Sequence, residues 1–136
     1  MKSIVVYPGS FNPFTLGHLE VVQKALQVFD VVLVARGINP AKEGSVTRAW
    51  GDVKLPRGAS YIEFTGLTAD LAKRVGACAV IKGIRNAVDL EDERTQQFYN
   101  AKFGLEIPTF FVLASPEMMC ISSTAERMIK KFKKGK

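Results

Sequence analysis

The sequence has few of the residues that would indicate a disulfide framework, a metal site or a membrane segment. Only two of its 136 residues are cysteines, Cys78 and Cys120, and their small or apolar neighbours favour reduced, buried thiols. No charged amino-terminal stretch precedes an apolar run, and no apolar run is long enough to span a bilayer. We therefore expect a soluble, cytoplasmic protein that neither is secreted nor enters a membrane.

The positive charge is concentrated at one end of the chain. The formal net charge is +6, and five lysines lie within the last seven residues, Lys130, Lys131, Lys133, Lys134 and Lys136. A positive charge could serve a nucleic acid, a membrane surface or a small polyanion such as a nucleoside triphosphate. A terminal lysine run is typical of a solvated helix end, so we expect neither nucleic acid nor membrane as a partner.

Short β-branched runs alternate with stretches of helical period, which is typical of successive βαβ units. The pattern predicts strands over residues 3–7, 31–35, 61–64, 77–81 and 107–113, and helices over 17–29, 67–75, 87–103 and from about 123. Residues 36–58 are expected to form a loop with little regular structure. The chain should form one domain, residues 1–136, with a Rossmann-like α/β fold: a doubly wound, five-stranded parallel sheet with helices on both faces.

The first predicted strand ends in the segment YPGSFNPFTLGH, residues 7–18. In an open parallel sheet, ligands bind beyond the carboxyl ends of the strands, where the strand order reverses. Gly9 permits close backbone approach and Ser10 offers a hydroxyl. The only histidine, His18, lies in the first turn of a helix, where N–H groups and the helix dipole favour phosphate. We predict a phosphate site here, with a structural role for His18 as the alternative.

Two later segments have similar chemistry. In IKGIRNAVDLEDE, residues 81–93, Lys82 and Arg85 flank a glycine, so two cations should converge on one polyphosphate-sized volume. Glu93 lies about two helical turns further on and could by itself be an ordinary exposed carboxylate. In CISSTAER, residues 120–127, three hydroxyls at a helix start could bind a second phosphate, although Ser123 could also act only as an N-cap.

These segments resemble the signatures of the nucleotidyltransferase superfamily. GSFNPFTLGH is similar to G-[ST]-F-[DN]-P-x-[TH]-x-G-H, and ISSTAER is similar to I-S-S-[ST]-x-x-[RK]. Residues 82–93 resemble R-G-[IL]-R-x-x-x-D-[FY]-x-x-E of the bacterial phosphopantetheine adenylyltransferases. The resemblance covers nearly the whole chain and implies transfer of AMP from ATP to 4'-phosphopantetheine. The products would be dephospho-coenzyme A, in coenzyme A biosynthesis, and pyrophosphate.

The resemblance also implies the site residues. The catalytic residues would be His18, Lys42 and Arg85. The ATP site would comprise Ser10, Phe11, His18, Gly83, Ile84, Arg85, Glu93, Met118, Ile121, Ser122, Ser123 and Thr124. The acceptor would contact Ser10, Lys42, Thr68 and Lys82. An acceptor phosphate is already ionised at neutral pH, so catalysis would consist of positioning and charge neutralisation. Mg²⁺ would be bound mainly by ATP phosphates, because no cluster of carboxylates suggests a metal site in the protein.

The chain departs from that family's pattern in several places. Lys82 stands in place of an arginine, residues 45–50 replace a T-x-E-E-R pattern, and Met118 replaces an aromatic residue. The chain ends soon after its last predicted helix begins, so the family's hexamer is only one candidate for a homo-oligomer. A nicotinamide mononucleotide adenylyltransferase is the alternative enzyme, although that family usually has histidine in place of Thr15. A non-catalytic nucleotide- or nucleic-acid-binding module is a further alternative, without a supporting aromatic-basic motif.

Overall fold

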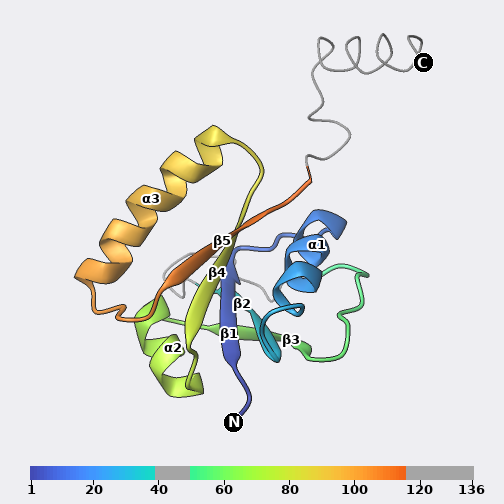
Figure 1. Cartoon of the computed structure of the whole chain (residues 1–136), viewed down its shortest axis with the longest axis horizontal. Coiled ribbons are helices and arrows are strands. Elements are labelled where there is room, and N and C mark those ends of the chain that lie inside the picture. The colour runs from blue at the N-terminus through green and yellow to red at the C-terminus, as the bar shows by residue number, and fades with distance from the viewer. Residues whose placement is uncertain (39–49, 116–136) are drawn as a thin grey trace, which may run out of the picture.

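The computed structural model describes residues 1–38 and 50–115, which form a parallel sheet of five strands with three helices (Figure 1). The strands are β1 (Ile4–Gly9), β2 (Val31–Gly37), β3 (Ala59–Phe64), β4 (Ala79–Ile84) and β5 (Thr109–Leu113). The helices are α1 (Leu16–Ala25), α2 (Thr68–Val75) and α3 (Ala87–Lys102). The predicted fold class, a doubly wound five-stranded parallel sheet, is confirmed.

The strand order is β3-β2-β1-β4-β5, with β1 at the centre. The chain first builds the sheet outward from β1 through β2 to β3, and then crosses back to add β4 and β5 on the other side of β1. The order therefore reverses between β1 and β4. The pairing of β1 with β2 extends over the six residues of β1, whereas its pairing with β4 consists of only Val5↔Ala79 and Val6↔Val80.

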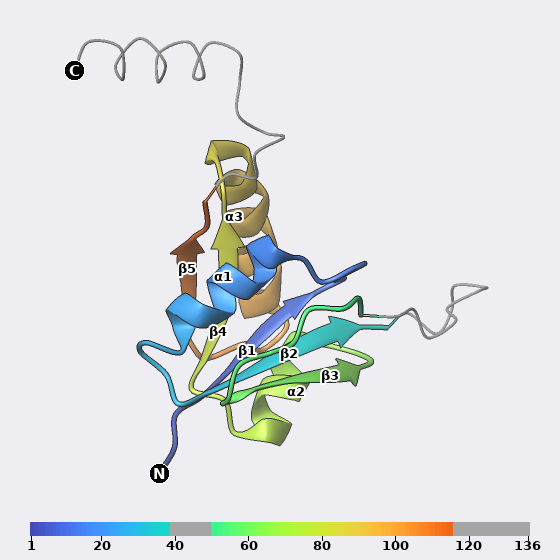
Figure 2. The same ribbon diagram turned by 90° about the vertical axis from the view of Figure 1, so that its right-hand side faces the viewer.

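Helices cover both faces of the sheet. Helix α1 packs on one face, where Val22 and Ala25 belong to the same buried cluster as Val5 of β1, and α2 packs on the opposite face, where Leu71 shares a second cluster with Val6. Successive residues of a strand point to opposite faces, so the fully apolar run of β1 is buried on both sides. Figure 1 shows α1 on one side of the sheet and α2 and α3 on the other. Figure 2 shows α1 lying across the sheet and the twist that separates the directions of β3 and β5.

Several element boundaries differ from those predicted from the sequence. Strand β4 does not end at Ile81 but continues through Ile84, because its last three residues pair with Phe111 to Leu113 of β5. Helix α1 ends at Ala25 rather than Phe29, although the Phe29 side chain still packs against the core. Apolar spacing specified the face that is buried but not the residue at which the helix stops. Helix α2 ends at Val75 and is closed by Gly76 in a left-handed conformation (φ 71°), as predicted from the sequence.

Helix α3 contains no buried residue, and it exposes Phe98 and Tyr99. Among residues 1–38 and 50–115, no helix has both the length and the apolar character needed to cross a membrane. The prediction that Cys78 is buried is wrong, because its side chain is exposed. Cys78 lies in the turn before β4, where its N–H donates to the carbonyl of Ile4 and its neighbours Ala77 and Ala79 point into the core. Cys120, the predicted last helix and the terminal lysines lie outside the described residues.

Candidate active site

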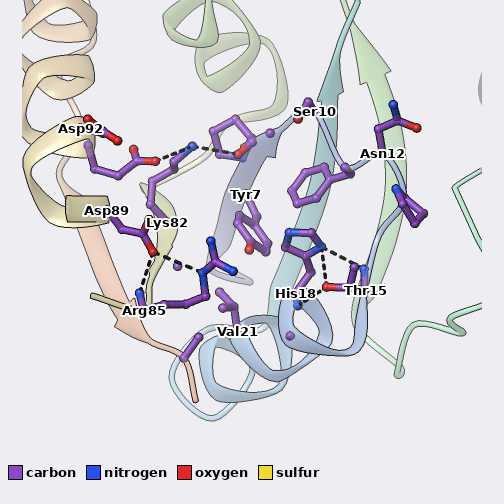
Figure 3. A pocket seen from close by; sticks show the side chains of 18 residues that line it. Tyr7, Ser10, Asn12, Thr15, His18, Val21, Lys82, Arg85, Asp89 and Asp92 are labelled. Atoms are coloured by element: carbon purple, nitrogen blue, oxygen red, sulfur yellow. Dashed lines mark hydrogen bonds and ion pairs between the residues drawn. The ribbon is translucent and has the colours of Figure 1, made fainter. Parts of the chain in front are cut away.

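A cleft of about 550 Å³ lies at the carboxyl ends of β1 and β4 (Figure 3). Its walls are the end of β1 with the following loop, the start of α1, the end of β4 and the start of α3. The lining includes Tyr7, Ser10, Phe11, Thr15, His18, Lys82, Gly83, Arg85, Asp89, Asp92 and Glu93. The strand order reverses at this place, which is where open α/β sheets bind their ligands.

The loop after β1 is tightly packed. Phe11 has a positive φ of 41°, and its ring is buried against Gly9, where an added Cβ would lie only 2.9 Å from the ring. The backbone N–H of Phe14 donates to the carbonyl of Trp50 at 2.9 Å. Glycine at position 9 is therefore a packing requirement of the loop that presents Ser10 to the cleft.

A buried arginine, Arg36, supports this loop through a hydrogen bond to its backbone. Arg36, near the end of β2, is 6% exposed, and its guanidinium donates from Nη2 to the carbonyl of Phe11 at 2.7 Å. It also lies 3.9 Å from the centre of the Trp50 ring and 3.9 Å from a carboxylate oxygen of Glu63. A buried cation needs such partners to offset the loss of its hydration. The sequence pattern predicts Arg36 and Trp50 within an irregular loop and contains no signal for this contact.

His18 lies at the start of α1, beside the loop. Thr15 is the N-cap of this helix, and its backbone N–H donates to Nδ1 of His18 at 2.9 Å. The imidazole also contacts the ring of Phe11, with centroids 5.0 Å apart and planes at 89°, and the ring of Phe14 at 5.3 Å. The predicted phosphate-binding histidine is therefore part of the cleft wall, in an aromatic environment.

Lys82 crosses the cleft towards α3. Its Nζ lies 3.3 Å from Oε1 of Glu93 and donates to the carbonyl of Pro8 at 3.2 Å. Both side chains of the ion pair are about one-fifth exposed, and the second oxygen of Glu93 is buried with no hydrogen-bond partner in the described part of the chain. Burial raises the pKa of the nearby Tyr7 phenol far above its usual value, and the charge of Glu93 raises it further while Arg85 opposes. Tyr7 is therefore protonated throughout the physiological range.

Arg85, just before α3, is paired with Asp89 in the first turn of that helix. Its Nε and its backbone N–H both donate to Oδ2 of Asp89, at 3.3 and 3.1 Å. Asn86 caps the helix by accepting a hydrogen bond from the N–H of Asp89 at 2.9 Å. A carboxylate at a helix start also interacts favourably with the helix dipole. Asp89 was not predicted as a site residue, although its spacing of four from Arg85 was a visible signal.

The cleft brings together many of the residues expected from the sequence. Ser10, Phe11, His18, Lys82, Gly83, Arg85 and Glu93 all line it. Two expected residues do not. Ile84, the last residue of β4, is buried in the core, and Thr68 begins α2 outside the cleft. Lys42, Met118, Ile121, Ser122, Ser123 and Thr124 lie outside the described residues.

The acids of the cleft do not form a metal site by themselves. No three His, Cys, Asp or Glu side chains in residues 1–38 and 50–115 are grouped so that they could bind a metal ion. Asp89 and Glu93 are instead paired with the two cations of the cleft.

Comparison with known proteins defines the class. Residues 6–129 match the profile of the family described as cytidylyltransferase-like, so the fold is that of a nucleotidyltransferase. Three relatives are each called phosphopantetheine adenylyltransferase. The protein of Leptospira biflexa is 35% identical, covering 91% of this chain and 81% of its own length. The protein of Cytophaga hutchinsonii is 36% identical, covering 97% of this chain and 92% of its own length. The protein of Streptococcus pneumoniae is 33% identical, covering 95% of this chain and 84% of its own length.

The chain therefore belongs to the cytidylyltransferase-like family and, within it, to the phosphopantetheine adenylyltransferases. The resemblance drawn from the three sequence motifs is confirmed.

Proposed function

We propose that this enzyme transfers the adenylyl group of ATP to the phosphate of 4'-phosphopantetheine and releases pyrophosphate. The observation that carries the proposal is the shared cleft, in which His18 from α1 faces Lys82 and Arg85 from the end of β4 and the start of α3 (Figure 3). Relatives of the same name, similar over most of their length, support the choice of acceptor. The product would be dephospho-coenzyme A, an intermediate of coenzyme A biosynthesis.

The residues of the cleft suit this reaction without a general base. The acceptor phosphate is ionised at neutral pH and can attack the α-phosphorus of ATP directly, so the protein must align the two and neutralise charge. Ser10 and Lys82 would bind the acceptor phosphate. His18 would stabilise the charge that develops at the α-phosphate, and Arg85 would bind the triphosphate. Gly83, Phe11 and Glu93 would complete the ATP site.

Substrate binding would exchange the partners of the two cations. Lys82 and Arg85 are paired with carboxylates of α3, and a triphosphate carries more negative charge than either carboxylate. Mg²⁺ would be bound mainly by the phosphate oxygens, and it would neutralise part of the charge of the triphosphate. The pairing of Asp89 with Arg85 and of Glu93 with Lys82 supports the assignment of Mg²⁺ to the phosphates, because paired carboxylates are less available as metal ligands.

Residues outside the described ranges and outside the cleft complete the proposal. Lys42 would bind the acceptor phosphate, and Thr68, at the start of α2, would contact the acceptor. Met118, Ile121, Ser122, Ser123 and Thr124 would bind ATP. We also propose a homo-oligomer, because α3, its C-cap and the edge strand β5 expose four aromatic side chains, Phe98, Phe103, Phe110 and Phe111. With ATP as the donor, the reaction would take place in the cytoplasm.

An acceptor screen tests the proposed function. The protein is mixed with ATP, Mg²⁺ and one acceptor at a time, and pyrophosphate release is measured. We expect release with 4'-phosphopantetheine to be much faster than with nicotinamide mononucleotide. Faster release with the mononucleotide would overturn the choice of acceptor. Salt-sensitive binding of DNA or RNA, with no pyrophosphate release from any acceptor, would overturn the reaction itself.

A further inference from the structure

The hydrogen bonds between Thr15 and His18 determine which ring nitrogen of His18 bears the proton. The backbone N–H of Thr15 points at Nδ1 of His18 from 2.9 Å, and the Thr15 hydroxyl lies 3.1 Å from the same nitrogen. The same hydroxyl accepts a hydrogen bond from the backbone N–H of His18 at 3.4 Å. Figure 3 shows these contacts closing a ring at the start of α1. Because a backbone N–H can only donate, Nδ1 must present its lone pair.

A neutral imidazole has one proton for its two nitrogens. With Nδ1 acting as an acceptor, that proton must reside on Nε2. Phosphate oxygens are acceptors only, so a histidine that stabilises charge on a phosphate must offer them an N–H. The opposite tautomer would bring the lone pair of Nε2 towards a negatively charged oxygen and would repel it.

The ring is also restrained in orientation. Phe11 meets it edge to face, with centroids 5.0 Å apart, and Phe14 lies on another side at 5.3 Å. Turning the imidazole over would break the hydrogen bond from Thr15 and disturb both ring contacts. The arrangement therefore fixes the ring before any substrate binds, as electrostatic stabilisation of a transition state requires.

We propose that Thr15 is a positioning residue, which caps α1 and fixes His18 as the Nε2–H tautomer that donates to a phosphate oxygen of the substrate. The identity of that oxygen rests on the proposed adenylyl transfer, whereas the tautomer does not. The competing interpretation is that Thr15 is an ordinary helix cap, which stabilises the fold and has no influence on the imidazole.

Nuclear magnetic resonance of the full chain separates these interpretations, because His18 is the only histidine and its ring signals are unambiguous. In uniformly ¹⁵N-labelled protein without substrate, long-range ¹H–¹⁵N correlations report the tautomer of the neutral ring. We expect the Nε2–H form almost alone. A dominant Nδ1–H form, or a mixture like that of free histidine, would overturn the proposal whatever the enzyme's activity.

Substitution of Thr15 tests its side chain. Thr15→Ala keeps the backbone N–H but removes the hydroxyl that ties Thr15 to Nδ1 and to the backbone N–H of His18, so the remaining N–H should no longer be held in line with Nδ1. We therefore expect a mixed tautomer population and a roughly tenfold lower kcat, less than the loss of about a hundredfold typical of deleting a donor. The KM for ATP should change little, and Thr15→Ser, which retains the hydroxyl, should restore both readouts. An unchanged tautomer and kcat in Thr15→Ala would make the residue a simple cap and contradict the proposal.

The matched control is Asn86→Ala, which removes the N-cap of α3. It should destabilise the fold to a similar extent and leave the ring signals of His18 unchanged. If Asn86→Ala altered the tautomer as much as Thr15→Ala did, the effect would be one of general stability and the proposal would be wrong. A pure Nε2–H form in a protein inactive towards 4'-phosphopantetheine would overturn the proposed function and leave the tautomer assignment intact.

Discussion

The ammonium of Lys82 lies 3.3 Å from the carboxylate of Glu93, so an ion pair joins β4 to α3 across the cleft. The pair is only about one-fifth exposed, and removing one partner leaves the other charge poorly solvated. We expect Lys82→Met to lower the free energy of unfolding by about 1–2 kcal/mol, after allowance for the remaining solvent screening. It should also raise the KM for the acceptor. Urea unfolding and steady-state kinetics measure the two effects.

The double variant provides the control for that prediction. In Lys82→Met combined with Glu93→Gln, no charge is left unpaired, so part of the lost stability should return. Strictly additive losses would show that the ion pair contributes nothing. Lys82→Arg keeps the charge and should retain stability.

Replacement of His18 should affect turnover and not ATP binding. The role proposed for the imidazole is specific to the transition state, so His18→Ala should lower kcat by roughly 10²–10³-fold. The dissociation constant for Mg²⁺-ATP, measured by calorimetry, should change less than about threefold. Similar losses in affinity and turnover would assign His18 to ground-state binding instead.

Arg36 should be indispensable to the loop that it supports. Arg36→Met removes the hydrogen bond to Phe11 and leaves a buried carbonyl unpaired, so we expect a loss of about 2–3 kcal/mol in the free energy of unfolding. Arg36→Lys should restore little, because an ammonium lacks the planar face that stacks on Trp50. Thermal and urea unfolding measure both variants.

The control for Arg36 is Arg94→Met, at an exposed ion pair with Glu91 on α3. Exposed pairs contribute little, so this variant should remain within about 0.5 kcal/mol of the original protein. Equal losses for the two variants would show that burial at Arg36 is without consequence.

Asp30 should make stability depend on pH. The backbone N–H and the hydroxyl of Ser3 both donate to its carboxylate, at 2.8 and 3.2 Å, and lower its pKa from the ordinary value of 3.8. A lowered folded-state pKa stabilises the protein above the unfolded value, and this contribution disappears as the pH falls through the folded value. Asp30→Asn should therefore unfold at lower urea concentration than the original protein at pH 7. The difference should shrink below pH 3.8, and a difference independent of pH would contradict the assignment.

The sequence predicted the parts of the site that lie along single segments. Ser10 and His18 follow β1, Lys82 lies near the end of β4 and Arg85 follows it, and parallel strands bring their carboxyl ends to one edge, so their meeting in the cleft followed from topology alone. The contact of Arg36 with Phe11 could not be found in this way. It depends on the packing of Arg36 and Trp50 against the loop in three dimensions, and no spacing in the sequence encodes that packing.

The error at Cys78 has a similar origin. Its neighbours in the sequence are small and apolar, and this composition suggested burial. The turn before β4 directs Ala77 and Ala79 inward and the thiol outward. Composition indicates that a segment is near the core, but the direction of each side chain depends on where the turn ends and the strand begins.

The short pairing of β1 with β4 has a mechanical consequence for the enzyme. Beyond Val6 and Val80 the two strands diverge without shared ladder hydrogen bonds, and the cleft occupies the opening between them. The loop after β1 and the end of β4, which carries Lys82, can therefore change their separation while the other strand pairings, which continue to the strand ends, stay intact. Substrates of different width could therefore be bound between β1 and β4, while the parts of the sheet on either side of this opening stay rigid.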